Sequence, residues 1–263
     1  MTKPVPARAT GYFHERPAPP FLRGTFSCTW IHRMPEASGA PIIVAPDGTI
    51  DLQWIDGIFR VAGPDKDPMI ETLPAATTVV GFRFQPAAAA AWLGVPAHQL
   101  LGQRPSLREL WGPRARRLAA KVREHRNIPE LTAALENAIA DFARKDARID
   151  ARMRAAYELI QAGPPAGVAL VPWLGRTLAM SERTLRRRFD ESFGYGPKTL
   201  DRILRYQRFL RLVRLSQRST AILAAEAGYS DQPHLVRESQ RLAGCTPLQV
   251  ERMMRTGSGR DER

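Results

Sequence analysis

Two segments near the C-terminus carry side chains that can bind nucleic acid. An arginine guanidinium can pair bidentately with the edge of a guanine or grip a phosphate, a glutamine can pair with adenine, and a valine can pack against a thymine methyl group. Both segments combine such side chains with a helix-capping serine or aspartate. The candidate contact residues are Ser181, Glu182, Arg183, Arg186 and Arg187 in the first segment and Gln232, His234, Val236 and Arg237 in the second.

The two segments are copies of one pattern that lie fifty residues apart. The spacing repeats without a gap at Leu185 and Leu235, Arg187 and Arg237, Gly194 and Gly244, Pro197 and Pro247, and Leu200 and Val250. In each copy a Ser or Asp caps a helix, a Leu faces the core, and Gly-x-x-Pro ends the helix and turns the chain. The repetition predicts a duplicated supersecondary unit that presents two short helices in equivalent roles.

Seven short helices with tight Gly or Pro junctions are predicted around this repeat. Apolar residues recur three or four positions apart along each one, which is the helical period. After Ser181, Leu185 and Phe189 share the inward face and the three arginines of this segment face outward. The expected helices are 151–161, 168–178, 181–193, 197–216, 219–227, 231–242 and 247–255. Their short connections predict a helix-turn-helix layout in each copy.

The positive charge of the chain is concentrated in this half. The formal net charge is +13, and residues 151–263 hold 20 Arg and Lys against 11 Asp and Glu, whereas the first 150 residues hold 19 against 15. A strongly basic domain joined to a domain of lower net charge indicates a function in nucleic-acid binding. The alternative for the arginines is a solvated helix face with ion pairs to Glu182 and Asp190, and for His234 an ordinary surface position.

Two stretches in the second copy carry a family pattern. They are Ala224-Ala-Glu-Ala-Gly-Tyr-Ser-Asp-Gln-Pro-His-Leu-Val-Arg237 and Gly244-Cys-Thr-Pro247, and with them the segment 152–255 resembles the double helix-turn-helix domain of AraC/XylS transcription regulators. Ser239 and Val250 stand where that family usually has aromatic residues, so the second unit is expected to pack less tightly than the first. The resemblance implies two recognition helices in successive major grooves, about 34 Å apart. Residues 197–216 would connect them.

The first half of the chain predicts a β-rich domain followed by helices. Short β-prone runs alternate with turn signals such as Asp56-Gly57, and residues 1–20 are typical of a frayed, proline-rich arm. The expected strands are 25–31, 41–44, 49–55, 58–61 and 77–84. After Pro86 the period becomes helical, and the expected helices are 87–93, 107–110 with a Ser106 cap, 113–125 and 129–142.

The predicted fold class is therefore α+β with two domains. Residues 1–148 would form a barrel- or sandwich-like domain of strands with a helical extension. Residues 149–256 would form an all-α domain of seven helices with two helix-turn-helix units, and residues 257–263 a disordered tail.

Aromatic residues in the predicted strands are candidates for an effector pocket. From Phe26 to His32 every second residue is Phe, Cys, Trp or His, so these side chains would share one face of a strand. The candidate pocket residues are Trp30, His32, Trp54, Phe82, Phe84 and Arg83, with Asp51 and Gln53 as further polar anchors. The alternative is that the rings form a packed core. The run 80–86, with 93–96 and 107–112, resembles a sensor-like domain of one subset of AraC-type regulators.

Metal binding and catalysis are not predicted. The histidines at 14, 32, 98, 125 and 234 are scattered, whereas a metal site needs clustered ligands. The chain has no Gly-x-Ser-x-Gly elbow and no phosphate-binding loop. Only Cys28 and Cys245 occur, which indicates neither a disulfide framework nor a zinc cluster. No apolar run approaches the roughly 20 residues that span a membrane. No cofactor is expected, and the chain is expected in the cytoplasm.

These observations predict a regulator of transcription and not an enzyme. Its partners would be double-stranded promoter DNA, RNA polymerase, a small organic effector and a second copy in a homodimer, and it could be an activator or a repressor. Two alternatives stay open. The N-terminal half could only dimerise an effector-independent regulator, or it could be a small-molecule-modifying enzyme fused to a DNA-binding domain. A closed apolar core would favour the former, and an open cavity with convergent polar groups would favour a sensor or an enzyme.

Overall fold

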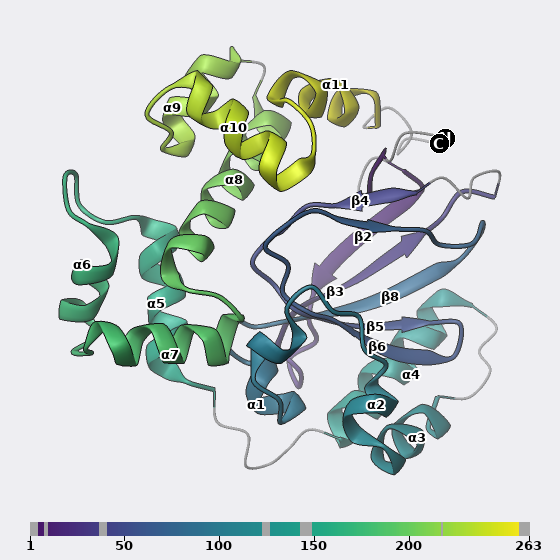
Figure 1. Ribbon diagram of the computed structural model, residues 1–263. Coiled ribbons are helices and arrows are strands. Elements are labelled where there is room, and N and C mark those ends of the chain that lie inside the picture. Colours follow the sequence, from purple (N-terminus) through teal and green to yellow (C-terminus); the bar gives the residue numbers. More distant parts are fainter. Residues whose placement is uncertain are drawn as a thin grey trace.

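The computed structural model describes residues 5–7, 10–36, 41–122, 127–142, 149–216 and 218–257. Strands dominate the chain as far as Phe84, and helices follow (Figure 1). The predicted domain boundary at residue 148 falls in the stretch 143–148, which lies outside the described residues. Apart from Gly257, the tail predicted at 257–263 also lies outside them.

The strands form two sheets within the described residues. A five-stranded antiparallel sheet has the order β2-β3-β8-β5-β6, and a three-stranded sheet has the order β1-β4-β7. The strands are β1 (Val5–Pro6), β2 (Tyr12–Pro17), β3 (Phe26–Arg33), β4 (Ile42–Val44), β5 (Asp51–Ile55), β6 (Ile58–Ala62), β7 (Met69–Glu71) and β8 (Thr78–Phe84). The β1–β4 pair is parallel, whereas β4 and β7 are antiparallel.

The five-stranded sheet is open, so the barrel alternative of the prediction is wrong. Its edge strands β2 and β6 do not pair with each other. The smaller sheet packs over one face, where Ile42 of β4 joins Cys28, Trp30 and Val79 in a small core. Helices cover the opposite face (Figure 1). The domain therefore buries both faces of its main sheet in a layered arrangement.

Strand β2 corrects the prediction of a frayed N-terminal arm. Tyr12 pairs with Arg33 of β3, and the antiparallel ladder continues to Pro17 opposite Cys28. The strand was missed because its residues are mostly polar and exposed, and it ends at a proline. Such a sequence is compatible with an edge strand, which needs hydrogen-bond partners on only one side.

The hairpin between β5 and β6 confirms the predicted Asp56-Gly57 turn. Both residues have positive φ angles, 46° at Asp56 and 85° at Gly57. This is the backbone of a two-residue type I′ turn, which matches the twist of antiparallel strands. The turn fixes the register that opposes Gln53 to Arg60.

Helices pack on the face of the five-stranded sheet that lies opposite the three-stranded sheet. They are α1 (Ala89–Leu93), the 3₁₀ helix η2 (Ala97–Leu100), α2 (Leu107–Trp111), α3 (Pro113–Ala120) and α4 (Ile128–Asp141). The predicted Ser106 cap is confirmed: Ser106 and Glu109 form a reciprocal capping box at the start of α2. Trp92 and Leu135 pack with Phe82 and Phe84 in the core beneath the sheet.

The C-terminal domain contains the seven predicted helices. They are α5 (Ala151–Ala162), α6 (Leu170–Thr177), α7 (Glu182–Phe193), α8 (Pro197–Leu215), α9 (Thr220–Ala227), α10 (Gln232–Ala243) and α11 (Pro247–Gly257). Helix α8 connects the group α5–α7 to the group α9–α11 (Figure 1). One core runs through both groups and includes Leu185, Phe189, Tyr206, Leu235 and Val250.

Candidate nucleic-acid interface and interdomain cavity

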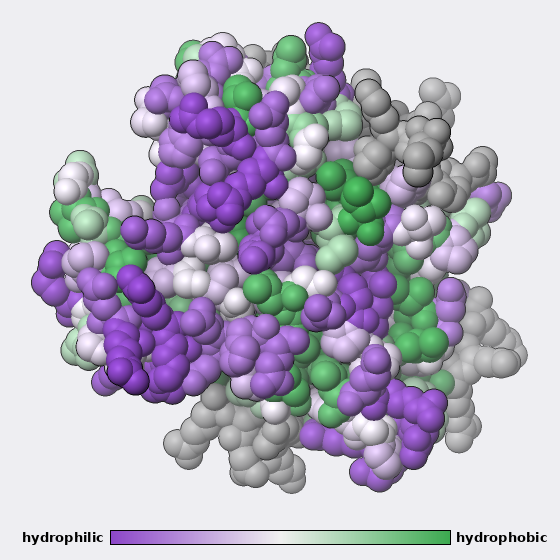
Figure 2. Space-filling model, in the orientation of Figure 1, coloured by the Kyte–Doolittle hydropathy of each residue, from purple (hydrophilic) through white to green (hydrophobic). Residues whose placement is uncertain are grey.

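Helices α6 and α7 form the first helix-turn-helix unit. The Ser181 hydroxyl accepts a hydrogen bond from the Thr184 amide at 3.2 Å and caps α7. Leu185 and Phe189 are fully buried and hold the helix on the domain. The opposite face presents Arg183, Arg186 and Arg187 to solvent, and Figure 2 shows hydrophilic side chains over this region.

The exposed arginines of α7 make only weak contacts within the chain. Arg186 lies 3.8 Å from Glu182, and Arg187 lies 2.8 Å from Glu191 instead of the expected Asp190. Both pairs join exposed side chains one helical turn apart, where an ion pair contributes about 0.3–0.5 kcal/mol. A phosphate or a base edge can therefore compete for either guanidinium.

Helices α9 and α10 form the second unit. The Asp231 carboxylate caps α10 by accepting the His234 amide at 2.7 Å, and this hydrogen bond lowers the pKa of Asp231. Gln232 and Arg237 are exposed, whereas His234 and Val236 are half-buried. The His234 ring meets Tyr229 edge-on, with centroids 5.2 Å apart. Its position is therefore more constrained than that of an ordinary surface histidine.

Two side chains of helix α8 contact α10 of the second unit. Arg202 forms an ion pair with Glu238 of α10 at 3.2 Å. The Tyr206 hydroxyl lies 3.2 Å from the Ser239 hydroxyl, which also donates to the Cys245 carbonyl at 2.8 Å. Ser239 is fully buried, and its hydroxyl is hydrogen-bonded to both Tyr206 and Cys245. These hydrogen bonds replace the aromatic packing expected at this position.

The first unit docks on the N-terminal domain. Helix α7 packs against η2 and α1. At its end, Gly194 has a φ of 81°, and a Cβ there would lie 2.7 Å from Cγ of Pro64. The junction therefore requires a glycine, which fits the left-handed backbone and leaves room for the neighbouring domain.

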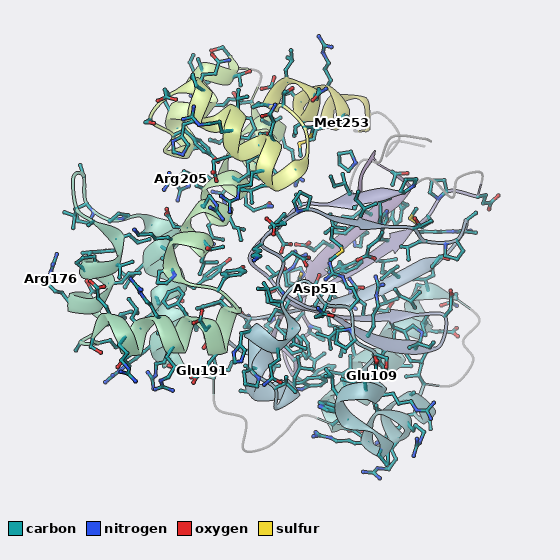
Figure 3. The ribbon with its side chains drawn as sticks, viewed as in Figure 1. Asp51, Glu109, Arg176, Glu191, Arg205 and Met253 are labelled. Carbon is teal, nitrogen blue, oxygen red and sulfur yellow. The ribbon has the colours of Figure 1, made fainter. Side chains whose placement is uncertain are left out.

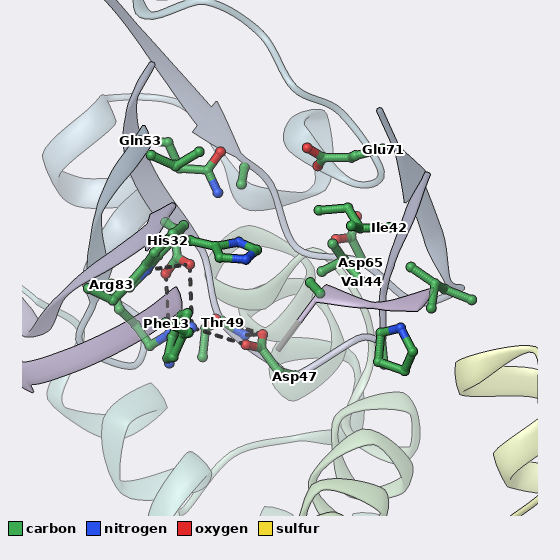
Figure 4. Close-up of a pocket in the computed structure, with 18 of the residues that line it drawn as sticks. Phe13, His32, Ile42, Val44, Asp47, Thr49, Gln53, Asp65, Glu71 and Arg83 are labelled. Atoms are coloured by element: carbon green, nitrogen blue, oxygen red, sulfur yellow. Dashed lines mark hydrogen bonds and ion pairs between the residues drawn. The ribbon is translucent and has the colours of Figure 1, made fainter. Parts of the chain in front are cut away.

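A cavity of about 180 Å³ lies between the two sheets and the C-terminal domain (Figure 4). Trp30, His32 and Arg83 of the candidate pocket line it, as do the further anchors Asp51 and Gln53. Its remaining wall comes from the C-terminal domain: Gln207, Leu210 and Arg214 of α8 and Met254 of α11. The cavity is thus an interdomain site.

The other three candidate pocket residues lie on the opposite face of the sheet. Trp54, Phe82 and Phe84 belong to the packed core beneath the helices, and the structure does not bring them to Trp30. Register explains the separation. Trp30 and Gln53 both oppose Gly81 of β8, so the neighbouring residues of each strand face the other way. Phe26 also turns to that core, because a β-bulge lies between it and Cys28.

Gly81 allows the Trp30 ring to lie against the sheet. A Cβ at position 81 would sit 2.0 Å from Cε2 of Trp30, so only glycine leaves the space for the indole. The Trp30 ring also stacks on Phe13, with centroids 5.8 Å apart. The two rings form an apolar part of the cavity wall.

Arg83 organises the first polar group of the wall. Its Nε lies 3.3 Å from the carboxylate of Asp51, a residue labelled in Figure 3. The same carboxylate accepts the Trp30 indole N–H at 3.0 Å. Arg83 further pairs with Asp47 at 3.4 Å and Glu15 at 3.2 Å. Burial raises the pKa of Asp51, and the Arg83 charge opposes that rise.

A second polar group consists of Arg60, Glu71, Arg104 and Asp65. Arg60 contacts Glu71 at 2.6 Å and donates to the Gln53 side-chain oxygen at 2.7 Å. Arg104 pairs with Asp65 at 2.7 Å and Glu71 at 2.8 Å. Burial disfavours the ionised form of Glu71, but the two arginines outweigh burial and lower its pKa. Sequence analysis missed this group because no local motif connects residues on β6, β7 and two loops.

Models of two protein families match parts of the chain. Residues 174–253 match a family of helix-turn-helix domains, and residues 14–106 match a domain of unknown function (DUF6597). The C-terminal domain is an AraC-type helix-turn-helix domain, the DNA-binding part of transcription regulators. No curated protein matches the chain.

Solved structures of ToxT from Vibrio cholerae share the fold. One ToxT structure at 1.65 Å resolution is 10% identical, with a TM-score of 0.50, and the match covers 92% of this chain and 98% of ToxT. The apo form of a ToxT variant from strain SCE256 is 8% identical, with a TM-score of 0.51 and coverage of 91% and 100%. At this identity the likeness concerns the fold alone.

Two further properties bear on the site. Among the described residues, no group of three or more His, Cys, Asp or Glu is placed to hold a metal ion. No helix in the described part of the chain is long and apolar enough to cross a membrane.

Proposed function

We propose that this regulator acts in the cytoplasm on promoter DNA, which α7 and α10 read, and that a small organic effector in the interdomain cavity controls it. The proposal rests on one observation: both domains supply residues to the wall of the cavity. The sheet supplies Trp30, His32 and Arg83, and α8 supplies Gln207 and Leu210. A ligand in the cavity would therefore touch both the N-terminal domain and the helix that connects the two DNA-reading units.

Helix α8 offers a direct route from the cavity to the second unit. Gln207, Leu210 and Arg214 lie on the cavity side, three and four residues apart. Another side of the same helix holds α10 through Arg202 and Tyr206. A displacement of α8 would carry α10 with it. The first unit would stay with the N-terminal domain, because α7 is docked on η2 and α1.

The effector would therefore change the placement of one recognition helix relative to the other. Two grooves can be read together only if the helices have the correct separation and angle. A ligand that favours one arrangement shifts DNA affinity by its differential binding to the two arrangements. The open cavity with convergent polar groups favours this proposal over a domain that only dimerises.

Filling the cavity with a side chain tests this control. Ala62 lines the cavity at the end of β6, so Ala62→Phe should occupy the space of an effector. We expect the dissociation constant for a selected DNA duplex to change by about fivefold or more, as a typical allosteric coupling would produce. The matched control is Ala120→Phe at an exposed position of α3. A folded Ala62→Phe protein with wild-type DNA affinity would contradict control from the cavity.

A further inference from the structure

The cavity wall carries equal numbers of carboxylates and arginines. Four carboxylates and four arginines line the cavity. Asp51 and Asp47 contact Arg83, Asp65 contacts Arg104, and Glu71 contacts both Arg60 and Arg104. Each carboxylate of the wall thus has a guanidinium partner within the described part of the chain.

A charged ligand would find no counter-charge reserved for it. It would have to displace one of these ion pairs or enter with its own charge unpaired, and either process costs desolvation free energy. An uncharged ligand avoids this cost and can use the apolar surface of Phe13, Trp30, Ile42, Leu73, Val79 and Leu210. The balance of charges therefore selects against ions.

Two polar side chains on the sheet side of the cavity, those of Gln53 and His32, can orient a ligand. The Gln53 oxygen accepts from Arg60, which leaves its Nε2 as a donor. His32 donates from Nε2 to the Thr10 carbonyl at 2.7 Å, since a carbonyl can only accept, and burial lowers the pKa of His32. The neutral ring keeps Nδ1 as an acceptor. Figure 4 shows Gln53 and His32 on the sheet side of the cavity.

We infer that the effector is an uncharged molecule with one ring that carries a hydrogen-bond acceptor beside a donor, as a primary carboxamide does. Its carbonyl would accept from Gln53, its N–H would donate to His32, and its ring would lie near Trp30. The size follows from the volume: the cavity measures about 180 Å³, and a cavity of about 150 Å³ holds benzene. This inference rests on the proposed effector function and specifies its ligand class.

Two probes that differ in charge test the ligand class. Phenylacetamide and phenylacetate have nearly the same shape, and their binding to the full chain can be measured by titration calorimetry at neutral pH. We expect the amide to bind about tenfold more tightly or better, since a buried unpaired ion is costly. Equal or tighter binding of the acetate would overturn the inference, and so would binding of neither probe.

Two variants assign the effect to the named residues. Gln53→Leu should weaken the amide about fivefold or more by removing a donor, whereas Gln99→Leu at an exposed position of η2 should not. Glu71→Gln removes one carboxylate while retaining its shape, so it should shift the preference about tenfold toward the acetate. An unchanged preference in folded Glu71→Gln would also count against the inference.

The outcome separates this inference from the proposed function. If the acetate binds more tightly than the amide and Ala62→Phe blocks its binding, the cavity is an effector site whose ligand is an anion. If Ala62→Phe leaves DNA affinity unchanged, the proposed control itself fails, whichever probe binds.

Discussion

Replacing Arg83 with alanine is expected to destabilise the N-terminal domain by about 3–5 kcal/mol, the cost of breaking a buried ion pair by removing one partner. Asp51 would stay buried at 11% side-chain exposure without the guanidinium that now lies 3.3 Å away. The measurement is the free energy of unfolding from a urea titration. Arg154→Ala is the control, because Arg154 and Glu158 are both exposed and their pair contributes about 0.5 kcal/mol or less.

The loss caused by Arg83→Ala should grow as the pH rises from about 4 to neutrality, above the usual aspartate pKa. Burial already raises the pKa of Asp51, and without Arg83 this pKa would rise further. The folded variant would then keep a proton that the unfolded chain releases, so the folded state would lose stability with increasing pH. A loss below about 1 kcal/mol, or one that does not depend on pH, would show that the Asp51–Arg83 pair is not buried as described.

Replacing Phe189 with alanine should destabilise the C-terminal domain by about 3–5 kcal/mol, because the change leaves a cavity in a packed core. Phe189 is fully buried, and its ring lies 5.2 Å from that of Phe193. Since Phe189 anchors the inner face of α7, DNA binding through the first unit should fail with it. Phe21→Ala serves as the control, since Phe21 is 58% exposed. Wild-type stability in Phe189→Ala would contradict the assigned helix face.

Local signals explain why the C-terminal domain could be predicted from the sequence. Ser181 and Asp231 cap the helices that they precede, and Gly194 and Gly244 end them in the left-handed conformation. Caps, stops and the 3.6-residue period are read within a single helix. The fifty-residue repeat then places the second unit by analogy with the first.

Long-range pairing explains why the cavity could be predicted only in part. The alternation that places Trp30 and His32 on one face is local and was visible in the sequence. Whether Trp54 and Phe82 lie on that face depends on the register of β3, β8 and β5, which are far apart in the chain. The wall from α8 and α11 depends on domain docking, and no residue pattern in either helix indicates it.

Mapping of the two half-sites tests the central claim most directly. DNA duplexes selected by the full chain should show two protected stretches about one helical turn apart. Arg187→Ala should cost about 1–3 kcal/mol of binding free energy and relax the sequence preference in one stretch, and Arg237→Ala should do the same in the other. If both substitutions relax the same stretch, or if both leave the footprint and the affinity unchanged, α7 and α10 do not read DNA as paired units.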